Sequence, residues 1–77
     1  MTKYVFYYNV YHPDGRRTMD FSPFVCNAGI PTQDDIHHFE TGQQNNLRKD
    51  EDGVFVKFVQ YRKATIEDGH LFRKDGE

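Results

Sequence analysis

The segment 4–11 constrains the fold most, because its sequence, Tyr-Val-Phe-Tyr-Tyr-Asn-Val-Tyr, is almost entirely β-branched and aromatic. This composition predicts a β-strand. The next four residues, His12-Pro13-Asp14-Gly15, are typical of a type I turn with proline second and glycine fourth. Both faces of the strand carry apolar or aromatic side chains, so both faces of the sheet that contains it need cover.

The residues after the turn predict the second arm of a hairpin. Segment 16–22 alternates, with Arg17, Met19 and Phe21 on one side and polar residues on the other. Pro23 is expected to end or bend this arm, and residues 24–26 to form a short continuation. Residues 54–62, Val-Phe-Val-Lys-Phe-Val-Gln-Tyr-Arg, predict a further long strand, and residues 65–72 a short fourth one.

Between these strands the sequence predicts one helix. Thr32 is a suitable N-cap, and Asp34 and Asp35 fall in the first turn, where the helix dipole favours negative charge. Apolar and amide side chains then recur at spacings of three and four and form a narrow stripe that would face the sheet: Ile36, Phe39, Gln43 and Leu47. Glycine at position 42 weakens this helix by about 1 kcal/mol relative to alanine.

The 77 residues suffice for one small domain. We expect an α+β fold over residues 1–72, in which one helix packs on one face of an antiparallel sheet, followed by a frayed tail at 73–77. The single cysteine, Cys26, predicts a reducing compartment, and the chain lacks a long apolar run or an apolar leader segment. These features favour a cytoplasmic protein without a membrane segment.

A single helix covers only one face of such a sheet. If the helix stripe packs on the side that carries Phe6, Tyr8, Val56, Phe58 and Met19, the opposite face keeps a large aromatic and apolar set: Tyr7, Tyr11, Phe55, Val59 and Tyr61. Three explanations remain open. The C-terminal segment with Ile66, Leu71 and Phe72 covers this set; or the set is a protein interface, homodimeric or with a target; or it stacks bases of single-stranded nucleic acid.

The sequence offers little support for catalysis or for a cofactor. Asp34 and His38 have the spacing of two metal ligands on a helix, but the sequence shows no third ligand, so no metal is predicted. His12 and His70 are expected to be exposed loop residues, and Cys26 a small buried apolar residue. Because no nucleophile–base pattern or phosphate-binding glycine loop occurs, the prediction is a protein without enzymatic activity.

Charge is unevenly distributed, although the chain carries 10 basic and 12 acidic residues with a net charge of −2. Segment 34–52 has six acids and two bases, whereas 57–74 has five bases and two acids. The acidic helix and loop are either ordinary solvated surface or a surface that steers a basic partner. The bulk charge does not favour a general nucleic-acid binder.

The layout as a whole resembles a known group of proteins. It combines the aromatic first strand and tight turn, a short second strand, a helix that opens with Pro31-Thr32-Gln33-Asp34-Asp35-Ile36, and the strand Val54-Phe55-Val56-Lys57-Phe58-Val59. Over residues 3–63 it resembles the small single-domain proteins of bacteriophages and prophages, which include anti-CRISPR inhibitors. The resemblance implies a non-enzymatic protein that binds a host complex and blocks nucleic-acid loading or effector recruitment.

The aromatic face therefore predicts a protein-binding module, with a homodimer as another possibility. The resemblance implies that this module acts on a host protein or ribonucleoprotein complex in the bacterial cytoplasm. The predicted partner-binding residues are aromatic anchors and acidic side chains that would mimic phosphates or steer the partner: Tyr7, Tyr11, Phe55, Tyr61, Asp34, Asp35, Glu40, Asp50, Glu51 and Asp52. The alternative is a regulator that binds single-stranded RNA or DNA through the same aromatics and three basic residues: Lys57, Arg62 and Lys63.

Overall fold

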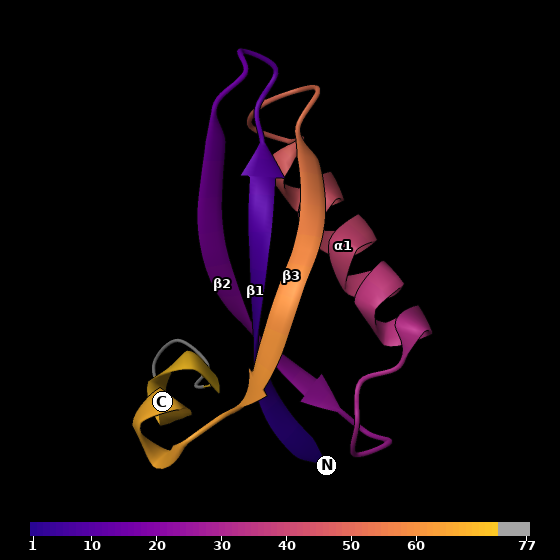
Figure 1. Ribbon diagram of the computed structural model, residues 1–77, viewed down its shortest axis with the longest axis vertical. Helices are drawn as coiled ribbons and strands as arrows, with labels where there is room; N and C mark the ends of the chain where they lie inside the picture. Colours follow the sequence, from indigo (N-terminus) through magenta and orange to yellow (C-terminus); the bar gives the residue numbers. More distant parts are fainter. Residues whose placement is uncertain (73–77) are drawn as a thin grey trace.

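The computed structural model describes residues 1–72 and has the expected α+β architecture (Figure 1). In chain order its elements are β1 (Thr2–Tyr11), β2 (Arg17–Cys26), α1 (Gln33–Leu47), β3 (Phe55–Lys63) and the 3-10 helix η1 (Ile66–Phe72). The three strands form one antiparallel sheet in the order β2-β1-β3. The predicted frayed tail, 73–77, lies outside the described residues. Within residues 1–72, neither helix has the length and apolar character that crossing a membrane requires.

The β1–β2 hairpin closes through the predicted turn. The N–H of Gly15 donates to the carbonyl of His12 at 3.0 Å, and Gly15 has a φ of +92°, which a residue without a Cβ adopts at little cost. Tyr11 consequently pairs with Arg17. β2 then continues past Pro23 without a break, because β2 is an edge strand and proline can occupy a position whose N–H would face outward.

A β-bulge interrupts the pairing of β1 with β3. Tyr7 pairs with Gln60 and Tyr8 with Phe58, so Val59 is an additional residue on β3. Because side chains alternate between faces along a strand, one extra residue moves every later side chain to the other face. Tyr61 therefore lies on the α1 side of the sheet, opposite Phe6, and not on the other face as predicted from strict alternation.

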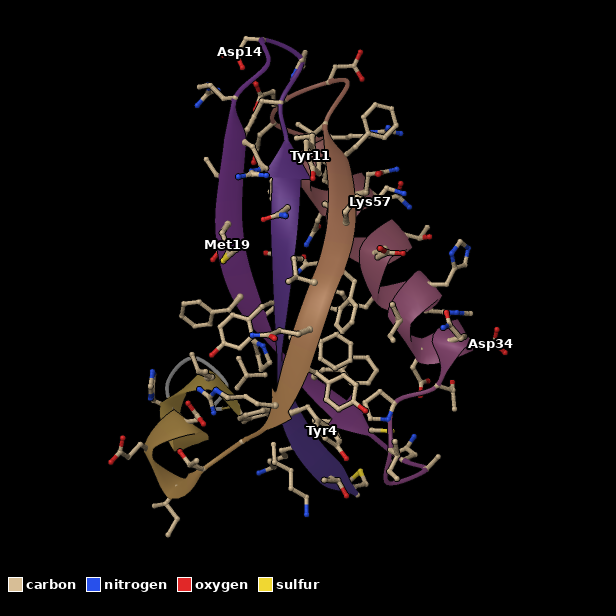
Figure 2. All side chains as sticks on the ribbon, viewed as in Figure 1. Tyr4, Tyr11, Asp14, Met19, Asp34 and Lys57 are labelled. Carbon is tan, nitrogen blue, oxygen red and sulfur yellow. The ribbon has the colours of Figure 1, made fainter. Side chains whose placement is uncertain are left out.

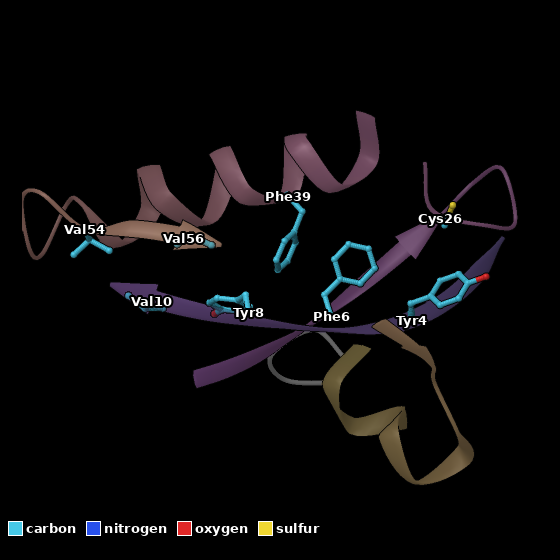
Figure 3. Close-up of a cluster of buried hydrophobic side chains, with 8 residues drawn as sticks. All are labelled: Tyr4, Phe6, Tyr8, Val10, Cys26, Phe39, Val54 and Val56. Atoms are coloured by element: carbon cyan, nitrogen blue, oxygen red, sulfur yellow. The ribbon is translucent and has the colours of Figure 1, made fainter. Parts of the chain in front are cut away.

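The core lies between α1 and the sheet (Figure 3). Its buried side chains come from alternate positions of β1 and from the facing elements: Tyr4, Phe6, Tyr8, Val10, Cys26, Phe39, Val54 and Val56. Phe39 of α1 is central, with ring centroids 4.9 Å from Phe6 and 5.4 Å from Tyr8. Ile36 and Leu47 pack against this cluster, so the predicted apolar stripe of the helix does face the sheet. Cys26 is buried, as predicted.

α1 begins with the predicted N-cap. The hydroxyl of Thr32 accepts from the N–H of Asp35 at 3.2 Å, and the carboxylate of Asp35 accepts from the N–H of Thr32 at 3.0 Å. This reciprocal capping box satisfies two donors that the first helical turn leaves unpaired. The hydrogen bond from Thr32 lowers the pKa of Asp35.

The segment predicted as a fourth strand is the 3-10 helix η1 instead. The carboxylate of Asp68 accepts from both the N–H (2.7 Å) and the hydroxyl (3.0 Å) of Thr65, and this local turn competes with an extended conformation. η1 lies on the side of the strands opposite α1 (Figure 3). On that side Val5 is fully buried, and the ammonium of Lys3 lies 5.3 Å from the ring centroid of Phe72.

Candidate functional site

The sheet face opposite α1 is only partly covered. η1 lies against one end of it, and the other end has no element over it among the described residues (Figure 1). We call the exposed end the open patch and define it by six residues: Tyr7, Tyr11, Arg17, Met19, Phe21 and Lys57. Met19 is 67% exposed, Phe21 51% and Tyr11 40%, which is high for side chains of this size and apolarity.

The hairpin register brings the residues of the open patch together. Tyr7 pairs with Phe21, Asn9 with Met19 and Tyr11 with Arg17, and directly paired residues share a face. Met19 was expected to pack beneath the helix, and this expectation was wrong. The loop of three residues at 13–15 sets a register in which Met19 faces away from α1 (Figure 2).

Tyr7 is the half-buried member of the open patch and is held by a network that reaches η1. The guanidinium of Arg62 donates to the Tyr7 hydroxyl at 2.9 Å and to both carboxylate oxygens of Asp68 at 2.7 and 3.0 Å. These hydrogen bonds hold the pKa of Asp68 well below its usual range and raise that of Arg62. The network fixes η1 on the sheet and leaves Tyr7 with a defined orientation.

The four predicted aromatic anchors do not form one surface. Tyr7 and Tyr11 lie on the open patch. Phe55 pairs with Tyr11 at the start of β3 and therefore shares its face of the sheet, although its ring lies 5.1 Å from the guanidinium of Arg48 at the end of α1. Tyr61 is on the α1 side, with its ring centroid 5.2 Å from that of Tyr4. Sequence alternation could not reveal this, because nothing in the strand sequence marks the bulge.

The three basic residues of the alternative prediction are also separated. Lys57 is exposed on the open patch, where it pairs with Asn9. Arg62 shares that face but is bonded to Asp68 and Tyr7. Lys63 pairs with Tyr4, whose side chain enters the core, so Lys63 lies on the α1 side. Arg17, which the sequence analysis did not select, is the second exposed base of the open patch.

Three of the predicted acidic residues have structural contacts. Asp35 belongs to the capping box described above, and the carboxylate of Glu40 accepts from the N–H of Phe58 on β3 at 2.8 Å. Glu51 lies 2.7 Å from Nδ1 of His12 and 3.6 Å from the guanidinium of Arg16. These contacts tie α1 and the loop before β3 to the rest of the fold.

The three other predicted acids are exposed but lie at opposite ends of the helix. Asp34 is in the first turn of α1, whereas Asp50 and Asp52 follow its last turn. The 15 residues of α1 rise by about 1.5 Å each, which separates the two ends by about 22 Å. The structure does not bring the predicted acidic residues into one patch.

His12 is not the exposed loop residue that was expected. Its side chain is only 14% exposed, and its Nε2 lies 3.1 Å from the hydroxyl of Thr18. Together with its contact to Glu51, this joins the tip of the hairpin to the loop between α1 and β3. His12 is therefore a structural residue that links the end of the hairpin to the loop before β3.

A shallow hollow of about 410 Å³ lies on the outer side of α1. It is lined by His37, His38, Thr41, Gly42 and Asn45. Nδ1 of His38 lies 3.0 Å from the main-chain carbonyl oxygen of Asp34. Within residues 1–72 no group of three or more metal-ligating side chains comes together.

Comparisons with known proteins give no further indication of function. No protein-family model, curated protein or solved structure shows a significant match to this chain. The candidate site therefore depends on geometry and chemistry alone. The open patch combines exposed aromatic, thioether and guanidinium side chains, the types that are enriched where proteins bind one another.

Proposed function

We propose that this protein is a non-enzymatic module that binds a partner protein through the open patch. The observation that carries the proposal is the exposure of Tyr11, Met19 and Phe21 side by side on a sheet face that α1 and η1 leave uncovered. Exposing large apolar side chains to water costs about 25 cal/mol per Å² relative to burying them. A partner that covers the open patch recovers this free energy.

Nucleic acid is the less supported partner. The faces of aromatic rings must be accessible and closely spaced to stack successive bases. The guanidinium of Arg62 lies 5.9 Å from the ring centroid of Tyr7. The guanidinium therefore occupies one face of the Tyr7 ring. Tyr11 and Phe21 are four residues apart along the hairpin register, about 13 Å, which is too far for adjacent bases.

A homodimer through the open patch is also disfavoured. The strand residues on this face of the sheet include four bases, Lys3, Arg17, Lys57 and Arg62, and no acid. Two copies related by a twofold axis would bring identical patches together, so one interface would contain the exposed bases Arg17 and Lys57 of both copies and no acid from these strands. Like charges in a desolvated interface cost several kcal/mol.

Site-specific photocrosslinking tests the proposal. A benzophenone amino acid replaces Met19 in the open patch or, as the matched control, His37 on the exposed side of α1, and both variants are expressed in bacterial cells. We expect discrete protein adducts from position 19 that resist nuclease and are absent from position 37. Adducts from position 37 alone, adducts lost after nuclease treatment, or no adduct from either position would contradict the proposal.

The proposal includes the class of partner that the sequence resemblance implies, a bacterial defence or nucleic-acid-processing complex in the cytoplasm. Its support is the resemblance of the sequence layout to small phage-encoded proteins, which include such inhibitors. Expression of the chain in a bacterium that restricts a phage should then restore plaque formation, and Met19→Glu should abolish this effect. Equal plaque formation with the chain and with an empty vector, across hosts that carry different defence systems, would remove this part of the proposal.

A further inference from the structure

The first half of the outer edge of β3 is unsuited to binding a partner strand. The N–H of Val56 donates to the side-chain carbonyl of Gln44 at 3.1 Å, and the N–H of Phe58 donates to Glu40 at 2.8 Å. A strand that joins a sheet needs such outward donors for its own hydrogen bonds. Two side chains of α1 already occupy them over the first half of β3.

The outer edge of β2 is blocked in its middle. The N–H of Ala64 donates to the carbonyl of Lys3, so the main-chain N–H and C=O groups of odd-numbered β1 residues face β3 and those of even-numbered β1 residues face β2. Even-numbered β1 residues pair with even-numbered β2 residues. The main-chain N–H and C=O groups of odd-numbered β2 residues therefore point outward. At this edge the N–H of Phe21 donates to the carboxylate of Asp20 at 2.8 Å. Pro23 has no N–H. An incoming strand would meet two consecutive outward positions without a free donor.

These two edges favour a partner whose backbone is already hydrogen-bonded internally. An α-helix meets this condition and docks through side chains alone. Three strands span about 10 Å across their axes, which matches the diameter of one helix with its side chains. The opposite face of the same sheet accommodates α1 in this way.

The charges around the open patch specify the character of that helix. Arg17 is exposed on β2 beside Tyr11, at the end of the row that Met19 and Phe21 continue, and Lys57 is exposed on β3 beside Asn9. The described strand residues of this face include no acid. An apolar stripe would cover Tyr11, Met19 and Phe21. Acidic side chains at one end of that stripe and along its β3 border would meet Arg17 and Lys57.

A second copy of this chain does not supply such a helix. α1 has its apolar residues turned towards its own sheet. Its exposed positions are polar or glycine: Gln33, Asp34, His37, His38, Thr41, Gly42, Asn45 and Asn46. The partner of the open patch is therefore a different protein.

We infer that the open patch binds an acidic amphipathic α-helix of a partner protein, with Arg17 and Lys57 as the charged contacts of the docking site. This inference rests on the proposed function and specifies its partner. It requires no strand exchange at either edge of the sheet.

Fluorescence anisotropy with synthetic peptides tests the inference. The probe is a labelled peptide of about five helical turns with a leucine stripe bordered by glutamates. One control peptide carries lysine in place of each glutamate, a second has the same composition in scrambled order, and a single-stranded oligonucleotide serves as a third probe. The protein variants are Met19→Glu in the open patch and His37→Glu on α1, which introduce the same side chain at two exposed positions.

We expect the acidic stripe peptide to bind, and Met19→Glu or the pair Arg17→Glu and Lys57→Glu to weaken it by roughly tenfold or more, whereas His37→Glu has no effect. Affinity should fall as salt rises from about 50 to about 500 mM. Equal binding of the lysine peptide or the scrambled peptide would overturn the inference. Circular dichroism of each variant verifies that the fold is retained.

The peptide and crosslinking results together separate the two proposals. If no peptide binds but position 19 still crosslinks to a protein, the helix inference is wrong and the proposed function stands. If no peptide binds and position 19 gives no adduct, both are wrong. Preferential binding of the oligonucleotide would assign the open patch to nucleic acid and would also contradict both.

Discussion

The glycine in the middle of α1 allows a direct test of how the helix sits on the sheet. Gly42 is exposed, and a Cβ built at this position has no atom within 4 Å. The substitution Gly42→Ala therefore gains the full difference in helix propensity, about 1 kcal/mol, without a steric cost. For a domain of this size we expect a melting temperature about 4–8 °C higher and a urea midpoint about 1 M higher.

Gly53 provides the matched control, because the same substitution should have the opposite sign. Gly53 has a φ of +81°, and a Cβ built there lies 3.3 Å from Cγ of Pro13. The left-handed conformation costs alanine about 1–2 kcal/mol, which outweighs the gain of about 0.4–1 kcal/mol from a less flexible unfolded chain. If Gly42→Ala failed to stabilise the protein, the exposed placement of this helix face would be refuted. If Gly53→Ala raised the urea midpoint, the left-handed conformation of Gly53 would be refuted.

Three further outcomes follow from the hydrogen bonds described above. Hydrogen bonds from Arg62 lower the pKa of Asp68 in the folded state, so acid titration followed by circular dichroism should show stability falling below about pH 4, and Asp68→Asn should reduce this fall. Glu40→Ala leaves the N–H of Phe58 unpaired and should cost about 1–2 kcal/mol in urea unfolding, whereas Glu40→Gln, which keeps an acceptor, should cost less. Thr32→Ala removes the N-cap and should lower the free energy of unfolding by about 1 kcal/mol in the same assay.

The elements with strong local signals were predictable from the sequence. The aromatic run of β1, the proline-glycine turn and the Thr32 cap each specify their conformation through nearby residues, and the structure contains all three. The helix stripe also predicted the side of α1 that faces the core, with Phe39 at its centre. Local propensity and burial agree at these positions, which is why they could be inferred without a structure.

The composition of the candidate site could be predicted only in part. Tyr7, Tyr11, Phe55 and Lys57 lie on the predicted uncovered face, but Met19 and Phe21 join them through a register that depends on one residue in the hairpin loop. A three-residue loop that ends in a glycine with positive φ is a known hairpin type, so this register could have been derived from residues 13–15. Tyr61 could not have been placed, since the bulge at Val59 arises from pairing along the whole strand.

The structure also explains why part of the predicted surface is less available than the sequence suggested. Some residues were predicted to bind a partner only because they are charged. Among them are Glu40, Glu51 and Arg62, and each contacts another residue within the fold. A small domain has few other means of fastening its edges and termini, because its core is limited. In this protein, contacts of this kind hold α1 along β3, the loop before β3 against the hairpin, and η1 on the sheet.

The central strand connects the fold to the proposed function. β1 is apolar or aromatic on both faces, and a sheet of three strands with one helix can bury only one of them. η1 covers the second face near Val5, and none of the elements within residues 1–72 lies over Tyr11. Side-chain and proline positions block strand addition at β2 and over the first half of β3, so the uncovered end of the face is the part of the sheet that a partner can bury. A docked helix would complete the second layer that η1 begins.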